Sequence, residues 1–261
     1  MSYENPTIPI RPRAKCLLVI PARLHSTRLP QKLLLAETGK PLIQHTYEAA
    51  SQARNVDGVI VATDHEAIRQ RVEAFGGEAV MTSEACASGT DRVAEVAAAF
   101  PDVEIFINVQ GDEPEISAAA IEQVRRLLEE NPDAEMSTLA TPIRTLEKLQ
   151  DPACVKVVVG QNGQALYFSR SPIPHVRDGF EPLLEAEPPV FLQHLGIYAY
   201  RRDFLLRLTQ APPSPLEQLE KLEQLRVLEM GKSIAVGTTH EPSIGIDTPA
   251  DYAAFVRKMA S

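Results

Sequence analysis

Three cationic side chains lie close together near the start of the chain, in IPARLHSTRLPQK, residues 20–32. Arg23, Arg28 and Lys32 follow the apolar run CLLVI, although the net charge of the whole chain is −9. Arginine offers a planar fork for bidentate contacts and lysine a compact charge, which together suit the oxygens of a polyphosphate. Taken singly, each of these residues is better explained as a solvated cation on a loop than as a ligand contact. Three cations together in a proline-stiffened loop, however, predict a phosphate-binding site.

A candidate metal ligand follows a later apolar run, in VQGDEPEI, residues 109–116. The run ends in Gln110, Gly111 and Asp112. A carboxylate at the end of a strand can hold a divalent cation, and magnesium is the usual ion where triphosphates bind through one or two protein carboxylates. Gly-Asp and proline are also common in plain turns, so this segment alone does not establish a metal site.

A second carboxylate precedes the last expected helix, in SIGIDTPADY, residues 243–252. Thr248 fits the N-cap of this helix, Pro249 its first position and Asp251 its third, so these three residues have a structural role. That assignment leaves Asp247 unexplained. We expect Asp247 to complete a metal site with Asp112 if the fold brings the two carboxylates together.

Another cation lies in SGTDRVAEV, residues 88–96, where Ser88 to Asp91 can cap a helix that starts near Arg92. Helix capping explains the hydroxyl groups of this segment better than a contact with a ligand does. Arg92, however, sits near the positive end of the helix dipole, which does not favour a cation unless an anion is present. We therefore expect Arg92 to contact a ligand.

Short β-branched runs alternate with helical patterns along most of the chain, which predicts βαβ units and a largely parallel sheet with helices on both faces. The expected strands are residues 15–20, 58–63, 78–82, 104–110, 135–142 and 233–239. The expected helices are residues 41–53, 65–75, 91–100, 117–130 and 214–231. In such sheets ligands bind at the carboxyl ends of the strands, where the cationic loop and VQGDEPEI lie.

The alternation breaks between residues 153 and 200. There VKVVVG, the turn at 161–164 and ALYFSR predict an antiparallel hairpin, because Asn-Gly readily adopts the positive φ angles of a type I′ turn. In the next strand, FLQHLGIYAY, period-two alternation gives one face these residues: His194, Gly196, Tyr198 and Tyr200. A lone strand histidine is usually structural, but this face predicts a site or an interface.

Composition disfavours several classes of protein. The 35 acidic and 26 basic side chains argue against a nucleic-acid-binding surface. Three widely spaced cysteines give neither a disulfide framework nor a zinc spacing. The early apolar run, Cys16 to Ile20, is too short for a membrane span or a signal peptide, which predicts a cytoplasmic protein without membrane insertion. GxxxxGK[ST] and GxGxxG are absent, which disfavours Walker ATPases and typical dinucleotide dehydrogenases.

The length of 261 residues favours one domain, because an α/β chain of this size often closes around a single core. We expect this domain to span residues 15–261. The proline-containing start, residues 1–14, precedes the first expected strand and is predicted to be a flexible extension.

Taken in order, these segments resemble the 3-deoxy-manno-octulosonate (Kdo) cytidylyltransferases, or CMP-Kdo synthetases. The resemblance covers residues 15–258 and is carried by IPARLHSTRLPQK, VATDHE, SGTDR, NVQGDEP, ALYFSR, HLGIYAY, PLEQLEKLEQLR and GIDTPAD. Sugar-1-phosphate nucleotidyltransferases open instead with a glycine-rich GxGTRL pattern. CMP-sialate synthetases share the PAR…S opening in general form, but HLGIYAY and LEQLR are not expected in them.

The resemblance implies a Rossmann-like, mixed but mainly parallel sheet flanked by helices, of the nucleotide-diphospho-sugar transferase type. It implies a homodimer, with residues 153–200 as an antiparallel dimerisation insertion. The implied reaction transfers CMP from CTP to the anomeric hydroxyl of Kdo and releases pyrophosphate, for lipopolysaccharide synthesis.

The resemblance also implies a role for individual residues. The nucleotide would contact Arg23, Ser26, Arg28, Lys32, Arg92 and Gln110. Lys32, Asp112 and Asp247 would be catalytic, and the two aspartates would hold Mg²⁺. The acid sugar would contact Arg170, Arg177, His194, Tyr198, Glu223 and Gln224.

Two other functions remain open at this point. The sugar-site residues do not distinguish Kdo from another acid sugar, such as 8-amino-Kdo or sialic acid. A non-catalytic nucleotide-binding protein is the second alternative. It is disfavoured because a silent relative would be expected to have lost Lys32 or one of the two carboxylates.

Overall fold

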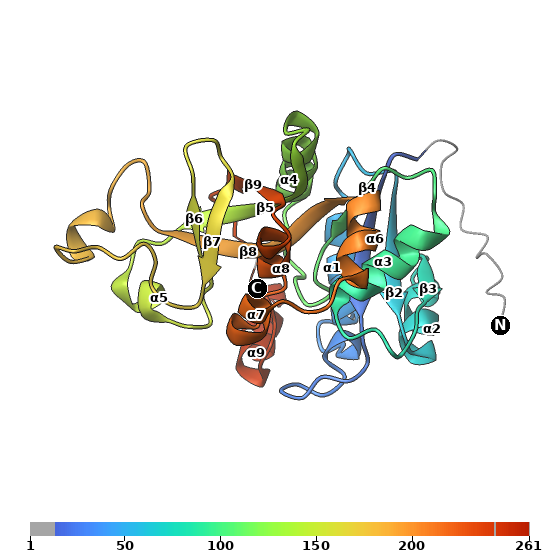
Figure 1. Cartoon of the computed structure of the whole chain (residues 1–261). Helices are drawn as coiled ribbons and strands as arrows, with labels where there is room; N and C mark the ends of the chain where they lie inside the picture. Colours follow the sequence, from blue (N-terminus) through green and yellow to red (C-terminus); the bar gives the residue numbers. More distant parts are fainter. Residues whose placement is uncertain (1–13, 243, 261) are drawn as a thin grey trace. The chain divides into compact units, whose positions relative to one another are not determined.

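The computed structural model describes residues 14–242 and 244–260, which form two compact units (Figure 1). The first takes its described residues from Met1–Glu122, Arg201–Thr209 and Ser243–Ser261, and the second consists of Gln123–Tyr200 and Gln210–Pro242. The single domain expected over residues 15–261 stays a prediction. The expected N-terminal extension lies outside the described residues, apart from Ala14, which is buried.

The first unit is built on parallel strands in the order β3-β2-β1-β4. These are β1 (Cys16–Ala22), β2 (Gly58–Thr63), β3 (Ala79–Met81) and β4 (Ile105–Asn108). All residues of β1 are buried, as expected for a central parallel strand. β1 continues past the expected end at Ile20, because Pro21 and Ala22 still pair with β2.

Helices pack against these strands and are capped much as the sequence predicts. α1 (Leu42–Ala50), α2 (Glu66–Ala74) and α3 (Gly89–Ala99) contact the sheet of the first unit. α3 begins at Gly89 rather than near Arg92, because Ser88 and Asp91 form a capping box. The final helix, α9 (Pro249–Met259), begins as expected. α4 (Ala118–Glu130) and α6 (Arg202–Gln210) contribute residues to both units, and α6 was not predicted.

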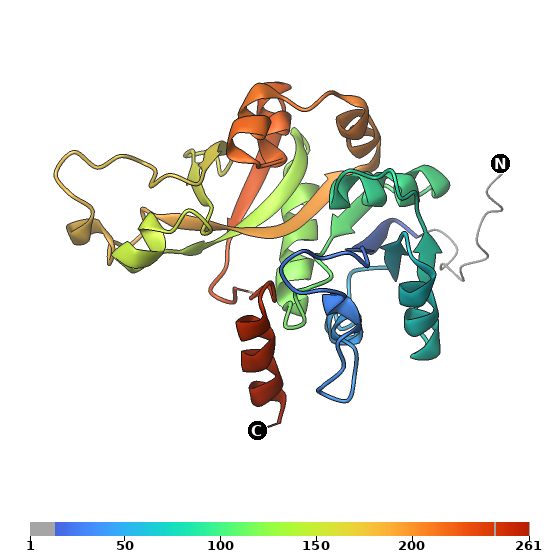
Figure 2. The ribbon, with the colours of Figure 1, turned by 90° about the horizontal axis from the view of Figure 1, so that it is seen from below.

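The second unit contains the antiparallel strands expected between residues 153 and 200. Its strands are β5 (Ala134–Pro142), β6 (Lys156–Val159), β7 (Ala165–Ser169), β8 (Leu192–Arg201) and β9 (Ser233–Thr238). β8 pairs antiparallel with β5 and β6, whereas β9 pairs parallel with β5. β6 and β7 form the expected hairpin. A long connection leads from β7 to β8, as Figure 2 shows.

The turn of this hairpin differs from the predicted type I′. Gly163 has φ +75°, whereas Asn162 does not have a positive φ. The Gly163 N–H donates to Gly160 O at 3.0 Å and the Gly160 N–H to Gln164 O at 2.8 Å. This is the pattern of a longer hairpin loop that ends in a left-handed glycine, so only one residue needs the left-handed conformation.

The prediction of a single helix over residues 214–231 is wrong. The chain forms α7 (Pro215–Glu220) and α8 (Gln224–Glu229), separated at Lys221, which has φ 55°. Leucines three residues apart drift around a straight helix and cannot share one face. The break resolves this conflict, because it buries Leu222 and Leu225 and leaves Leu219 80% exposed.

A small apolar cluster supports the connection between β7 and β8. Ile143, Leu149, Cys154 and Phe191 are its buried members, and Val176 and Phe180 of the connection pack against it. Leu149 belongs to α5 (Leu146–Gln150), and the connection itself contains the 3-10 helix η2 (Glu181–Leu183). Neither element was predicted. Within residues 14–242 and 244–260, no helix has the length and apolar character needed to cross a membrane.

Candidate active site

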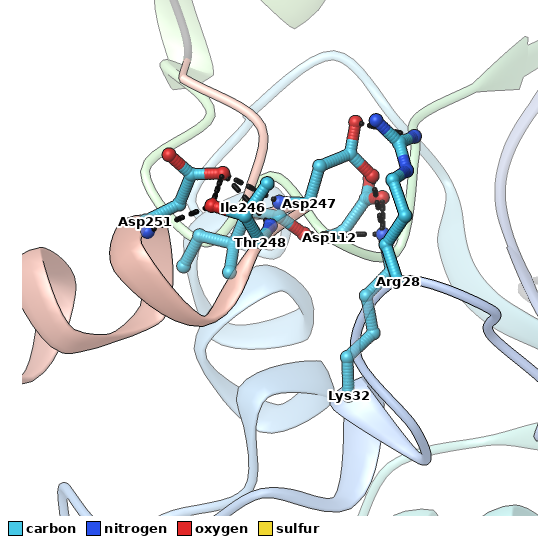
Figure 3. Close-up of polar contacts among 7 residues, drawn as sticks. All are labelled: Arg28, Lys32, Asp112, Ile246, Asp247, Thr248 and Asp251. Atoms are coloured by element: carbon cyan, nitrogen blue, oxygen red, sulfur yellow. Dashed lines mark hydrogen bonds and ion pairs between the residues drawn. The ribbon is translucent and has the colours of Figure 1, made fainter.

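Lys32 joins two carboxylates of the first unit (Figure 3). Its ammonium group donates to the Asp112 carboxylate, to Asp247 Oδ1 at 2.9 Å and to the main-chain oxygen of Ile246 at 3.1 Å. The Lys32 side chain is 13% exposed, against 24% for Asp112 and 44% for Asp247. The cation is therefore the most buried of the three groups, and Asp247 is the most accessible.

The cationic loop after β1 is anchored by apolar side chains. Leu29 and Leu33 are buried on either side of Lys32. Lys32 opens the short 3-10 helix η1 (Lys32–Leu34), and Gln31 before it has φ 52°, in the left-handed region. This turn is held by the Leu34 N–H, which donates to Gln31 O at 2.9 Å. The loop that carries Lys32 is thus a defined part of the fold.

Asp112 is positioned by tight packing of the chain before it. A Cβ atom on Gly111 would lie 3.1 Å from the main-chain oxygen of Pro21, so a larger residue would push the segment away from β1. The Thr46 hydroxyl of α1 donates to Gly111 O at 2.9 Å. The main-chain oxygen of Asp112 accepts the Ile246 N–H at 2.9 Å, which ties this segment to the chain before α9.

Asp247 is positioned by the cap of α9. Thr248 and Asp251 form a capping box, in which the Asp251 carboxylate accepts the Thr248 N–H and hydroxyl, both at 2.8 Å. The same carboxylate oxygen accepts the Asp247 N–H at 3.2 Å. On its outer side, Asp247 Oδ2 lies 3.0 Å from a terminal guanidinium nitrogen of Arg28. Asp247 therefore meets a cation at each carboxylate oxygen.

The pKa of Lys32 is set by two opposing effects. Burial would lower it, but the charge and hydrogen bond of Asp112, followed by those of Asp247, outweigh burial and raise the pKa above its usual value of 10.5. The amine is consequently charged at neutral pH. It is a fixed positive charge and not a proton acceptor, because a general base must have a pKa near the working pH.

The two carboxylates fit a magnesium ion that is shared with a bound triphosphate. Both can contact one ammonium nitrogen, so their oxygens are close enough to bind one small cation. Oxygen donors of this kind suit magnesium, which commonly keeps waters and takes its other ligands from phosphates. No group of three or more metal-binding side chains occurs among the described residues, so a closed protein cage is not formed by them.

The remaining residues of the predicted nucleotide site differ in accessibility. Arg23 and Arg28 are exposed, and Ser26 and Gln110 are partly exposed. The side-chain oxygen of Gln110 lies 4.0 Å from the position of a Cβ atom on Gly89, which is the first residue of α3. The structure brings Arg28 to Asp247, whereas the roles of Arg23, Ser26 and Gln110 stay predictions.

Arg92 has partners that the sequence analysis missed. It is 4% exposed, and its guanidinium donates to the Asp64 carboxylate and, at 2.8 Å, to the Thr82 hydroxyl. A further bond of 3.2 Å reaches Ser83 O. The anion that Arg92 was expected to meet near the start of α3 is therefore present within the fold, as Asp64 of the VATDHE segment. The nucleotide contact of Arg92 stays a prediction.

The predicted sugar-site residues lie in the second unit. Gln224 is 4% exposed at the start of α8, whereas Arg177 and Glu223 are exposed. Arg170 is partly exposed and directly follows β7. Their contact with a sugar stays a prediction.

His194 is buried and neutral. Its Nε2 lies 3.1 Å from the Thr138 hydroxyl, its ring packs edge-on against Phe168, and Tyr198 stacks on it at a tilt. Burial lowers the pKa of His194 from 6.5 to about 3. At neutral pH this imidazole is uncharged, and its contact with a sugar stays a prediction.

The strand expected over residues 191–200 contains an irregularity that the sequence pattern did not predict. A register shift lies between Thr138 and Leu139 of β5, which pair with Tyr198 and Leu195 of β8. The extra residues in β8 form a bulge that interrupts its pairing with β5. The Thr138 hydroxyl fills it by donating to the main-chain oxygens of Leu195 and Ile197, at 3.1 and 2.8 Å. Of the face predicted to be a site or an interface, His194 and Tyr200 are buried, whereas Gly196 and Tyr198 are partly exposed.

Comparison with known proteins decides the family. A family model described as cytidylyltransferase matches residues 17–234. The chain belongs to the cytidylyltransferase family. A 3-deoxy-manno-octulosonate cytidylyltransferase of Rhodopirellula baltica is 51% identical, over 95% of this chain and 99% of the relative. A protein of the same name from Geobacter sulfurreducens is 48% identical, over 92% and 98% of the two chains.

Solved structures agree with this placement among the cytidylyltransferases. A structure of CMP:2-keto-3-deoxy-manno-octonic acid synthetase complexed with CTP has a TM-score of 0.87 and 44% identity, and covers 95% of this chain and 99% of that chain. A 4-diphosphocytidyl-2C-methyl-D-erythritol synthase of Anaerococcus prevotii, with a TM-score of 0.62 and 12% identity over 96% and 100% of the chains, shares the fold alone. The predicted family and fold class are confirmed, whereas a dimerisation role of residues 153–200 stays a prediction.

Proposed function

We propose that this cytidylyltransferase transfers CMP from CTP to the anomeric hydroxyl of Kdo, giving CMP-Kdo and pyrophosphate for lipopolysaccharide synthesis. The observation that carries the proposal is the contact of Lys32 with both Asp112 and Asp247 in a chain that is 51% identical to a Kdo cytidylyltransferase. This group combines a fixed cation with two accessible carboxylates, as binding of a metal triphosphate requires.

The nucleotide site would lie in the first unit. Six residues would contact CTP: Arg23, Ser26, Arg28, Lys32, Arg92 and Gln110. Asp112 and Asp247 would hold Mg²⁺, which when bound would neutralise triphosphate charge and make the attacking hydroxyl more acidic. Lys32 and Arg28 would add fixed positive charge for the phosphate oxygens, and Lys32 would also keep the two carboxylates at their places.

The acid sugar would contact residues of the second unit. Its carboxylate suits the cations Arg170 and Arg177, because a guanidinium can bind both carboxylate oxygens at once. Its hydroxyls suit His194, Tyr198, Glu223 and Gln224, which can donate or accept single hydrogen bonds. The attacking hydroxyl and the leaving pyrophosphate must lie in line at the α-phosphorus, so the main task of these side chains would be orientation.

Three further properties belong to the same proposal. The enzyme would use Mg²⁺, act in the cytoplasm and form a homodimer through residues 153–200. It would act without nucleic acid and without insertion into a membrane, since its net charge of −9 does not favour a nucleic-acid surface.

The decisive measurement is pyrophosphate release with Mg²⁺ and CTP in the presence of Kdo, 8-amino-Kdo, sialic acid or no acceptor. Release that requires both CTP and Kdo is the expected result. Release with another acid sugar alone would keep the nucleotide site and overturn the choice of Kdo. No release with any acceptor would favour a non-catalytic nucleotide-binding protein.

A further inference from the structure

Lys156 is a fully buried lysine of the second unit, at the start of β6. Its ammonium group donates to three main-chain oxygens, those of Asp151 at 2.9 Å, Cys154 at 2.6 Å and Arg170 at 2.6 Å. An ammonium has three N–H donors, so these bonds use all of them. Burying a charge is costly unless its hydrogen bonds are complete, and here they are completed by the main chain around Arg170.

Glu220 holds the same main-chain segment through other atoms. One carboxylate oxygen accepts the Ser169 hydroxyl at 2.6 Å, and the other accepts the Arg170 N–H at 3.0 Å. Lys156 therefore fixes the carbonyl group of Arg170 while Glu220 fixes its N–H. The two charged side chains secure both main-chain polar groups of one residue.

The Arg170 side chain is oriented by the break between α7 and α8. Its Nε donates to Glu220 O at 2.8 Å, and a terminal nitrogen lies 3.5 Å from Lys221 O. The last carbonyl groups of a helix lack helical partners, and a cation is favoured beside them. The other terminal nitrogen donates to Pro152 O at 3.0 Å. The left-handed turn at Lys221 thus provides two of the three acceptors that Arg170 uses.

These contacts leave Arg170 suited to an anion. A guanidinium has five N–H donors, and the three contacts above leave one donor on each terminal nitrogen, so two donors remain for the oxygens of a carboxylate. No carboxylate within the described part of the second unit forms an ion pair with this guanidinium, since its three partners are neutral carbonyl groups. A carboxylate of a substrate would supply the missing negative charge.

We propose that Lys156 and Glu220 are positioning residues for Arg170, which they hold so that its guanidinium binds the carboxylate of the acid sugar. The inference depends on the proposed function, because it takes Arg170 as a sugar-site residue. It predicts that changes at Lys156 or Glu220 weaken recognition of the acid sugar without weakening recognition of CTP.

The test compares Glu220→Ala, Glu220→Gln and Lys156→Met with the unchanged enzyme in the pyrophosphate assay. Glu220→Ala and Lys156→Met should each raise KM for the acid sugar about tenfold, since each variant loses a hydrogen bond between a charged side chain and the main chain of Arg170. KM for CTP should stay within about twofold of its value in the unchanged enzyme. Glu220→Gln should restore much of the affinity, because an amide can accept the Arg170 N–H and donate to Ser169.

A second readout separates positioning from general loss of structure. The ratio of kcat/KM for Kdo to that for its C1 amide measures recognition of the carboxylate itself. This ratio should fall about tenfold in Glu220→Ala. The ratio for Glu220→Gln should lie between that of Glu220→Ala and that of the unchanged enzyme. Ser137→Ala is the control, because it removes a buried hydrogen bond of 2.6 Å to Val124 O, away from Arg170. It should lower thermal stability and leave the ratio unchanged.

Arg170→Met distinguishes the two ways in which the inference can fail. A raised KM for Kdo in Arg170→Met together with an unchanged KM and ratio in Glu220→Ala would overturn the positioning role alone. An unchanged KM in Arg170→Met would remove Arg170 from the sugar site and overturn the inference with it. If Lys156→Met does not fold, the two Glu220 variants still decide the outcome.

Discussion

The carboxylates of Asp112 and Asp247 meet at one ammonium group, that of Lys32. Asp112 follows β4 and Asp247 precedes α9, so the first unit joins two distant segments of the chain at this point. Two like charges held this close need a cation between them. The ammonium supplies it within the chain, and Arg28 adds a second positive charge at the outer oxygen of Asp247.

Replacement of either aspartate by asparagine should reduce turnover by about 100-fold or more, because the charge that holds the metal triphosphate is lost. The free energy of unfolding should change by no more than about 2 kcal/mol, since asparagine can still accept a hydrogen bond from Lys32. Pyrophosphate release and urea unfolding of Asp112→Asn and Asp247→Asn check the two expectations.

Asp102→Asn provides the matched control, because Asp102 is an exposed carboxylate outside the site. It should keep the turnover of the unchanged enzyme. Near-normal turnover in Asp112→Asn or in Asp247→Asn would remove that residue from the metal site.

The cap of α9 should matter for turnover as well as for stability. Thr248→Val removes the hydroxyl that accepts the Asp251 N–H at 3.2 Å and donates to its carboxylate, which should cost about 1 kcal/mol of unfolding free energy. Because the neighbouring Asp247 N–H is held by the same carboxylate, turnover should fall about tenfold.

Thr145→Val is the control for this experiment, since Thr145 caps α5 in the second unit. It should lose similar helix-capping energy and keep its turnover. Equal loss of turnover in both variants would mean that the effect of Thr248 is one of general stability, and that the cap does not place Asp247.

The start of α9 could be predicted from the sequence because the residues that determine it are neighbours in the chain. Thr248, Pro249 and Asp251 lie within four positions, and each has one favoured place at a helix start. The partner of Arg92 could not be predicted in this way. Asp64 meets it only because β2 and α3 are folded together, and the sequence gives no sign of which anion will be near.

The same distinction applies to the rest of the fold. The alternation of strands and helices in the first unit predicted its parallel strands well, because each burial pattern repeats over a few residues. The bulge of β8 and the break at Lys221 depend on what the neighbouring strands and helices can bury. The contact of Lys32 with both aspartates likewise required the folded chain, although each residue had been identified separately.

Lys221→Gly should stabilise the second unit. Lys221 is exposed and has φ 55° and ψ 48°, a left-handed conformation that costs a residue with a side chain roughly 1 kcal/mol or more. Glycine avoids this cost but loses more freedom on folding, so a net gain of about 0.5 kcal/mol is expected. Urea unfolding of Lys221→Gly and Lys221→Ala measures it, and a glycine variant no more stable than the alanine variant would contradict the left-handed break.

His194 should make the protein less stable in mild acid. Its pKa is about 3 in the folded chain because of burial, and 6.5 is the ordinary value for an exposed imidazole. Between these two values the unfolded chain binds a proton that the folded chain does not, so the free energy of unfolding falls as the pH falls. From pH 7 to pH 5 this group alone should remove about 2 kcal/mol.

The measurement is urea unfolding at pH 7 and pH 5 for the unchanged chain and for His194→Gln, which can keep a hydrogen bond to Thr138 but does not titrate. The loss between the two pH values should be about 2 kcal/mol smaller in the variant, whatever its absolute stability, because other titrating groups cancel in the comparison. His175→Gln, at an exposed position, controls for the loss of an imidazole. Equal losses in His194→Gln and the unchanged chain would show that His194 takes up its proton in the folded state, and would contradict the neutral, buried imidazole.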